Sequence, residues 1–121
     1  MKLAFISVPA GDYEASKKFY EEVLALPVIR EFNGKPHRET DYDLGNARLK
    51  VFEWTQPWYG GHHTSFMIST DDLDGVLKKV RDAGYEARPV EITEWGGRIA
   101  AVRDPFGNFI NLMDANQQGS S

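Results

Sequence analysis

The two halves of this sequence repeat the same order of structural elements, and this repeat restricts the fold more than any other feature. Asp12 and Asp72 lie 60 positions apart, and each stands where a short acidic side chain can cap a helix start. Around each of them the chain reads as strand, helix and three further strands, although the side chains themselves do not repeat. The pattern predicts an α+β fold of two tandem βαβββ modules, at about 1–56 and 61–114, followed by a polar tail at 115–121.

In the first half, an apolar strand is expected at 3–8, stopped by Pro9 and Gly11. Apolar residues then recur every three or four positions, which predicts one amphipathic helix that ends at Pro27. The apolar face of this helix consists of Ala15, Phe19, Tyr20, Val23, Leu24 and Leu26. Three strands are expected after it, at 28–32, 40–44 and 47–54.

The second half begins with a strand at 63–68, and a helix capped by Asp71 and Asp72 follows. Gly84 fits the end of that helix, since glycine readily adopts the left-handed conformation found there. A turn is expected at 104–108, where proline and glycine occupy suitable positions. Short strands are expected near 86–90, 98–102 and 109–113.

Composition excludes several classes of protein. The 121 residues contain no cysteine, which rules out disulfide scaffolds, cysteine-based zinc and iron–sulfur sites and a cysteine nucleophile. A net charge of −4 is unsuited to general nucleic-acid binding. No apolar run approaches the roughly 20 residues that span a bilayer, and the start lacks the long apolar stretch of a signal peptide. We therefore expect a cytoplasmic protein without nucleic-acid or membrane partners.

Several motifs in this order resemble the vicinal-oxygen-chelate superfamily, which includes glyoxalase I, bleomycin resistance proteins and extradiol dioxygenases. They are Phe5-Ile6-Ser7-Val8, the segment from Asp12 to Tyr20, His63-Thr64-Ser65-Phe66, Asp71-Asp72-Leu73-Asp74 and Asp104-Pro105-Phe106-Gly107-Asn108. The resemblance covers about 1–114. It implies that the two modules form a curved mixed sheet around a central pocket, and that the protein is a homodimer.

The resemblance also assigns four positions to metal ligands in those members that use a metal. In this sequence they hold Phe5, Lys50, His63 and Asn111. Only His63 is a good ligand, whereas a divalent ion needs three or four nitrogen or oxygen donors, commonly with a carboxylate. We therefore expect a degenerate site with no metal cofactor. The alternative is a divalent metal held by His63 with Glu53, although strand alternation turns Glu53 away from Lys50 unless a bulge intervenes.

Strand alternation also predicts which side chains line the pocket. They are Phe5, Ser7, Lys50, Phe52, Trp54, His63, Ser65, Met67, Phe109, Asn111 and Met113. This mixture of aromatic, apolar and a few polar groups is typical of a small-molecule site. Lys50 is expected either to reach the surface or to pair with an anionic group of a ligand. The nearby acidic residues Glu39, Asp41 and Asp43 are expected on a solvated loop or edge strand.

These features favour a protein that sequesters a small organic molecule in an aromatic pocket, as bleomycin-resistance-like members of the superfamily do. A second hypothesis is an enzyme: a metal-dependent lyase, isomerase or dioxygenase, or a metal-free acid/base catalyst that uses His63. A third is a scaffold without a ligand, which the polar groups among the pocket residues disfavour. The expected partners are a small organic molecule and a second copy of the chain.

Overall fold

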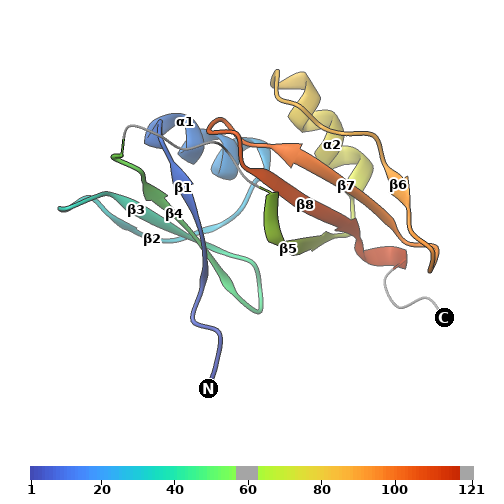
Figure 1. Ribbon diagram of the computed structural model, residues 1–121, viewed down its shortest axis with the longest axis horizontal. Helices are drawn as coiled ribbons and strands as arrows, with labels where there is room; N and C mark the ends of the chain where they lie inside the picture. Colours follow the sequence, from blue (N-terminus) through green and yellow to red (C-terminus); the bar gives the residue numbers. More distant parts are fainter. Residues whose placement is uncertain (57–62, 118–121) are drawn as a thin grey trace. The chain divides into compact units, whose positions relative to one another are not determined.

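The structure, a computed structural model, describes residues 1–56 and 63–117, and these fall into two compact units on either side of residue 60. Unit 1 contains β1 (Ile6–Ala10), α1 (Tyr13–Lys18), the π-helical turn η1 (Phe19–Val23), β2 (Val28–Phe32), β3 (Glu39–Asp43) and β4 (Arg48–Glu53). Unit 2 contains β5 (His63–Thr70), α2 (Leu73–Asp82), β6 (Glu91–Ile92), β7 (Arg98–Arg103), β8 (Phe109–Asp114) and the 3-10 turn η2 (Ala115–Gln117). Figure 1 shows a four-stranded mixed sheet in each unit, so the predicted α+β fold of two βαβββ modules is confirmed.

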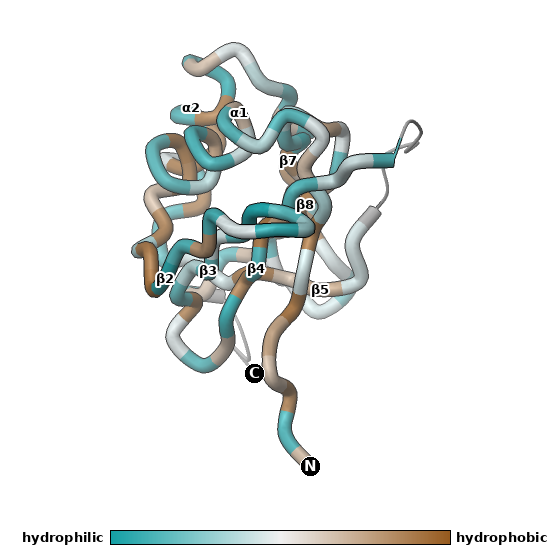
Figure 2. The backbone as a smooth tube through the Cα atoms, turned by 90° about the vertical axis from the view of Figure 1, so that its left-hand side faces the viewer, coloured by the Kyte–Doolittle hydropathy of each residue, from teal (hydrophilic) through white to brown (hydrophobic). Residues whose placement is uncertain are grey.

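The sheet of unit 1, sheet A, has the strand order β1-β4-β3-β2, with β1 parallel to β4 and the other pairs antiparallel. Hydrophilic and hydrophobic residues alternate over Arg48–Val51 of β4 (Figure 2), and one face of the sheet carries the buried side chains Val8, Leu49 and Val51. This face packs against α1 and η1, where the ring of Tyr20 stacks on that of Tyr42 with centroids 6.0 Å apart. Each such fully buried side chain contributes roughly 1.5–3 kcal/mol.

The first strand begins and ends later than expected. It continues through Pro9 to Ala10, so the prediction that Pro9 stops it was wrong. In the described part of sheet A, β1 lies at an edge and pairs only with β4. An edge strand tolerates proline because one side of its backbone needs no partner in the sheet.

The first helix also differs from the prediction of one regular helix. Asp12 caps it as expected, accepting a hydrogen bond from the Ala15 amide at 3.1 Å, but α1 gives way to η1 at Phe19. There the Leu24 amide donates to the Phe19 carbonyl five residues earlier. The buried residues of the two helical segments are Tyr13, Ser16, Phe19 and Tyr20, which differ from the apolar face that was expected.

The sheet of unit 2, sheet B, has the order β5-β8-β7-β6, and α2 packs on β8. Asp72 caps α2 through the Gly75 amide at 3.1 Å, and Gly84 follows the helix with a φ of 89°. The prediction of a strand at 86–90 was wrong, because that segment makes only one isolated β-bridge, from Ala87 to Val102. The short strand β6 comes just after it. No helix among the described residues is long and apolar enough to cross a membrane.

The turn predicted at 104–108 is confirmed. One carboxylate oxygen of Asp104 accepts from the Phe106 and Asn108 amides at 3.0 and 2.8 Å. The other oxygen accepts from the Asn108 side-chain nitrogen at 2.8 Å, and Gly107 has a φ of 91°. Asp104 and Asn108 are both buried, so this motif shapes the connection between β7 and β8.

Candidate functional site

Lys50 lies at the centre of the far face of sheet A, the face turned away from α1. Its ammonium lies 2.7 Å from a carboxylate oxygen of Glu39 and 3.1 Å from one of Asp41, both on the neighbouring strand β3. Arg30 lies 3.2 Å from Glu39 and 3.3 Å from Asp41, and Arg48 lies 3.4 Å from Asp41. We call these five side chains, three basic and two acidic, the β3–β4 ion network.

The network corrects two expectations. Lys50 neither reaches the surface nor stays free for a ligand, since its side chain is only 12% exposed and both neighbouring carboxylates hold it. Glu39 and Asp41 do not lie on a solvated edge, because β3 is an interior strand of sheet A and the Asp41 side chain is 4% exposed. Asp43, the last residue of β3, is exposed. Alternation assigned only Lys50 to this face, and it did not indicate that Glu39 and Asp41 would lie there and bind it.

Protonation follows from these contacts. The hydrogen bond from Lys50 is the largest cause of a lowered pKa for Glu39. Burial opposes the charge of Lys50, but its interactions with Glu39 and Asp41 outweigh this and raise the pKa of Lys50. Lys50 therefore stays an ammonium ion, which can neither donate a lone pair to a metal nor act as a nucleophile.

Aromatic side chains surround the network on the same face. The Lys50 ammonium lies 4.8 Å from the ring centroid of Phe5. The ring of Phe52 lies 6.3 Å from that of Trp54 and 6.0 Å from the imidazole of His37. Ser7 completes this face, opposite Lys50 in the strand pairing. Unit 1 thus brings its five sequence-predicted pocket residues onto or beside one face of sheet A.

Glu53 lies on the opposite side of β4, where its carboxylate is bound by Arg38. The Arg38 guanidinium donates to both oxygens of Glu53, at 3.2 and 3.0 Å, and it lowers the pKa of that carboxyl. The same guanidinium contacts α1 through Glu14 at 3.1 Å and the Tyr13 ring at 4.6 Å. Glu53 therefore tethers the helix to the sheet and does not face the side that carries Lys50.

In unit 2, the remaining predicted pocket residues lie on the strands β5 and β8. Met67 pairs with Asn111 across the two strands, and Phe109 and Met113 point to the same face as Asn111. Ser65 and Met67 are exposed. His63 begins β5, and its side chain lies outside the described part of the structure.

Asn111 has a structural task in this arrangement. The pairing of β5 with β8 shifts between His63 and Met67, and there the Asn111 amide nitrogen donates to the carbonyls of Thr64 at 3.0 Å and Phe66 at 3.2 Å. The side chain therefore satisfies two backbone acceptors that the irregular pairing leaves outside the sheet ladder.

A divalent metal of the kind expected from the resemblance finds few donors here. Phe5 offers none, Lys50 is an ion-paired ammonium, and the nitrogen of Asn111 donates to backbone oxygens. Among the side chains that the structure describes, which do not include His63, no group of three or more His, Asp and Glu is arranged to hold a metal ion. These three residues do not fit the ligand set that such an ion needs.

Sequence reasoning missed two arginines next to Phe109. The guanidinium of Arg103 lies 5.0 Å from the Phe109 ring centroid, and that of Arg88 lies 5.2 Å from it. Strand pairing could have indicated Arg103, since the turn at 104–108 brings it directly opposite Phe109. No periodic signal indicated Arg88, because it lies in the irregular segment before β6.

The chain matches the Glyoxalase/Bleomycin resistance protein/Dioxygenase superfamily over residues 2–112, and it belongs to that superfamily. A lactoylglutathione lyase of Haemophilus influenzae is 28% identical, over 94% of this chain and 93% of that protein. The crystal structure of TnmS3, an antibiotic-binding protein from a Streptomyces strain, is similar with a TM-score of 0.78 and 26% identity, over 93% of this chain and 94% of the other. A glyoxalase/bleomycin resistance protein from Streptomyces has a TM-score of 0.76 and 27% identity, over 93% and 99% of the two chains. The family resemblance of the motifs is thereby confirmed.

Proposed function

We propose that this protein binds a small organic molecule, without a metal cofactor, through the aromatic and polar residues predicted to line its pocket. The observation that carries the proposal is the pairing of Lys50 with Glu39 and Asp41. This pairing fixes an ammonium group at a position where metal-using relatives of this family have a metal-coordinating side chain. The likeness to the antibiotic-binding protein TnmS3 supports a binding role. The rings of Phe5, Phe52 and Trp54 offer flat apolar surfaces on which an organic molecule can stack.

The second candidate is a lactoylglutathione lyase, which the names of several relatives favour. In that case His63 would supply a metal ligand or the catalytic acid/base group. The chemistry of Phe5, Lys50 and Asn111 weighs against the metal-dependent form, so a metal-free reaction at His63 is the form of enzyme that fits the residues better.

A homodimer and a cytoplasmic location are further parts of the proposal. Exposed apolar side chains on the described part of unit 1 support self-association, since a single chain leaves them in water. They are Leu3, Phe5, Val28, Ile29 and Phe32. Light scattering coupled to gel filtration should give twice the mass of one chain, and a monomer at micromolar concentration would contradict the dimer.

The deciding experiment combines elemental analysis with an activity assay on protein purified without chelators. The proposal predicts less than a tenth of an equivalent of bound divalent metal and no lactoylglutathione lyase activity after addition of nickel or zinc. It also predicts that, in a screen of aromatic compounds, at least one binds and quenches the tryptophan fluorescence of the protein. A stoichiometric metal together with turnover would overturn the proposal in favour of the lyase.

The variant His63→Ala distinguishes the two metal-free hypotheses, a binding protein and an acid/base enzyme. Under the binding proposal, this variant changes the ligand affinity by less than about tenfold and there is no turnover to lose. If the wild-type protein transforms the ligand and His63→Ala abolishes turnover while binding persists, the protein is an enzyme with His63 as its acid/base group.

A further inference from the structure

Arg88 and Arg103 are less closely paired with carboxylates than Arg98, which lies in the same unit. The Arg98 guanidinium lies 2.6 Å from Asp74 and 3.1 Å from Asp114, so it forms ion pairs with two carboxylates. Arg88 and Arg103 instead share the single carboxylate of Glu86, at 3.8 and 3.6 Å, beyond hydrogen-bond distance. Neither guanidinium makes a side-chain hydrogen bond to any residue that the structure describes.

The Phe109 ring positions both guanidiniums. Their central carbons lie 5.2 and 5.0 Å from its centroid, which is the range of a cation–π contact. The backbone fixes the same geometry, because the Arg88 amide donates to the Ala101 carbonyl at 2.8 Å and the Arg103 amide to the Glu86 carbonyl at 2.9 Å. Both guanidinium groups are therefore held near one ring, and their N–H groups remain available to donate hydrogen bonds to a ligand.

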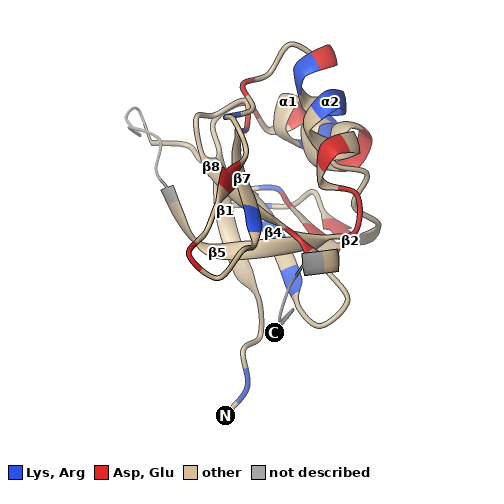
Figure 3. Ribbon diagram, turned by 90° about the vertical axis from the view of Figure 1, so that its right-hand side faces the viewer, with Lys and Arg blue, Asp and Glu red and all other residues tan. Residues whose placement is uncertain are grey.

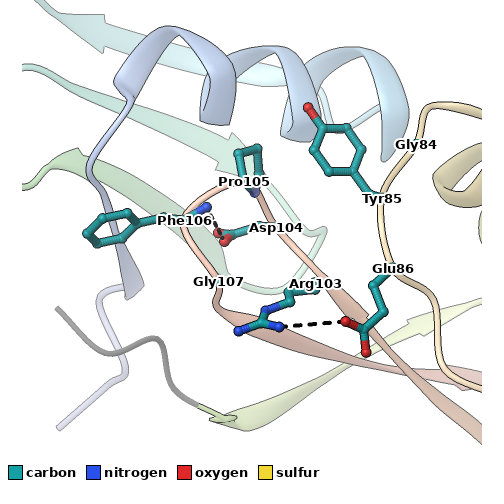
Figure 4. A pocket seen from close by; sticks show the side chains of 8 residues that line it. All are labelled: Gly84, Tyr85, Glu86, Arg103, Asp104, Pro105, Phe106 and Gly107. Atoms are coloured by element: carbon teal, nitrogen blue, oxygen red, sulfur yellow. Dashed lines mark hydrogen bonds and ion pairs between the residues drawn. The ribbon is translucent and has the colours of Figure 1, made fainter.

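A depression lies beside this arginine pair, formed within unit 2 by the residues before β6 and the turn after β7. Its volume is about 410 Å³, and it is lined by Gly84, Tyr85, Glu86, Arg103, Asp104, Pro105, Phe106 and Gly107. Figure 4 shows the side chains of Arg103 and Glu86 pointing toward one another at this depression. The side chains of both arginines are about half exposed, at 55% for Arg88 and 46% for Arg103, so a solute can reach them.

We propose that Arg88 and Arg103 bind the anionic end of the organic ligand, a carboxylate or a phosphate group attached to an apolar body. This inference rests on the proposed function, since it assigns the chemical class of the ligand. An oxyanion can accept hydrogen bonds from both guanidinium forks at once, and such charge-assisted bonds are stronger than bonds between neutral groups. Phe109 belongs to the predicted pocket lining, so the arginine pair would hold the charge of the ligand beside this residue.

Removal of the Glu86 charge should change the ligand affinity in the opposite direction to removal of an arginine. Its carboxylate is the anion that the two guanidiniums share in the described structure, and it is half exposed on a loop. A bound oxyanion takes its place and must compete with it. Removal of the Glu86 charge should therefore strengthen binding, whereas removal of either arginine should weaken it.

Calorimetric titration of the full chain with benzoate, phenyl phosphate and the neutral benzamide tests the inference. We expect at least one of the two anions to bind at least tenfold more tightly than benzamide, and to bind less tightly as salt is added. The anion that binds more tightly identifies the group as carboxylate or phosphate. Arg88→Gln and Arg103→Gln should each weaken binding of that anion about tenfold, and Glu86→Gln should strengthen it about threefold.

Matched control variants change the net charge of unit 2 by the same amount elsewhere. Lys78→Gln removes a positive charge from an exposed pair on α2, and Glu91→Gln removes a negative charge from the exposed strand β6. Each should change the affinity by less than twofold. Circular dichroism of every variant checks that the fold persists.

Equal affinity for benzamide and both anions would overturn the inference and leave the proposed binding function standing. Weaker binding in Glu86→Gln, or equal effects of the arginine and control variants, would also overturn it. Absence of binding by all three probes would overturn it as well, whereas the proposed function is overturned separately, by stoichiometric metal with lyase turnover.

Discussion

The ammonium of Lys50 lies 2.7 Å from the carboxylate of Glu39, and both side chains are mostly shielded from water, at 12% and 17% exposure. The pair lies within a mixed-charge group, and Figure 3 shows how residues of both signs are interspersed through the molecule. Attraction between such groups is stronger than at a fully exposed surface, yet each has also lost hydration. The pair therefore matters most when one partner is removed.

Replacement of Lys50 by methionine should destabilise the fold by about 2–4 kcal/mol, because it removes the ammonium that lies nearest to the shielded carboxylates of Glu39 and Asp41. Urea unfolding measures this loss. Lys50→Arg, which keeps the charge, should recover at least half of it. A loss below about 0.5 kcal/mol for Lys50→Met would show that the pair contributes little.

Acid should also destabilise the protein through Glu39. Because Lys50 lowers the pKa of Glu39 in the folded state, its contribution is present above the ordinary value of 4.5 and is lost as the pH falls through the lower folded-state pKa. Urea midpoints measured from pH 7 down to pH 3 should fall less steeply in Glu39→Gln than in the wild-type protein. Lys50→Met should flatten the same profile because it removes the main cause of the shift, and an unchanged slope in both variants would contradict this account.

The fold could be predicted because its signals are local. Two acidic caps and the turn at Asp104 each act over a few residues, and alternation along strands such as β4 and β8 reports which face is buried. The π-helical turn at Phe19 could not be predicted, since the same apolar spacing also fits a regular helix. The prediction that Pro9 stops the first strand was wrong because the free-energy cost of a proline in a strand depends on whether that strand lies at the edge of its sheet.

The candidate site was harder to predict than the fold. Alternation assigned Lys50, Phe52 and Ser7 to one face, but it says nothing of which neighbour a charged group will bind. Pairing depends on strand register, which sets Lys50 opposite Asp41, and on side-chain reach, which brings in Glu39. Arg88 was missed because irregular backbone has no period from which its direction could be inferred.

Asn111→Asp should destabilise unit 2 more at neutral than at acidic pH. The amide nitrogen of Asn111 donates to the Thr64 and Phe66 carbonyls, and a carboxylate would instead set negative oxygens against those acceptors. We expect a loss of about 2–4 kcal/mol at pH 7. The new carboxyl should have a raised pKa, so its protonated form is favoured in the folded state. Stability relative to the wild type then recovers as the pH falls through that raised pKa, and the recovery is complete once the pH is below about 4.

The matched variant for this test is Asn111→Leu, which removes the donor without adding charge. It should cost about 1–3 kcal/mol, with no dependence of that cost on pH. Urea unfolding at pH 7 and pH 3.5 measures both variants. Equal losses for Asn111→Asp at the two pH values would contradict the predicted contact with the carbonyls of β5.

The buried turn between β7 and β8 should depend on the direction of the bond between Asp104 and Asn108. Asp104→Ala removes an acceptor of three hydrogen bonds and should cost about 2–4 kcal/mol. Asp104→Asn keeps an oxygen for the two backbone amides, but its new amide group faces the donor nitrogen of Asn108. Asn108→Asp added to Asp104→Asn restores an acceptor opposite that group, so the double variant should be about 1 kcal/mol more stable than Asp104→Asn alone. Thermal unfolding of the wild-type protein, Asp104→Asn, Asn108→Asp and the double variant measures this recovery. Purely additive losses of the two single variants would show that the side-chain bond is not what holds the turn.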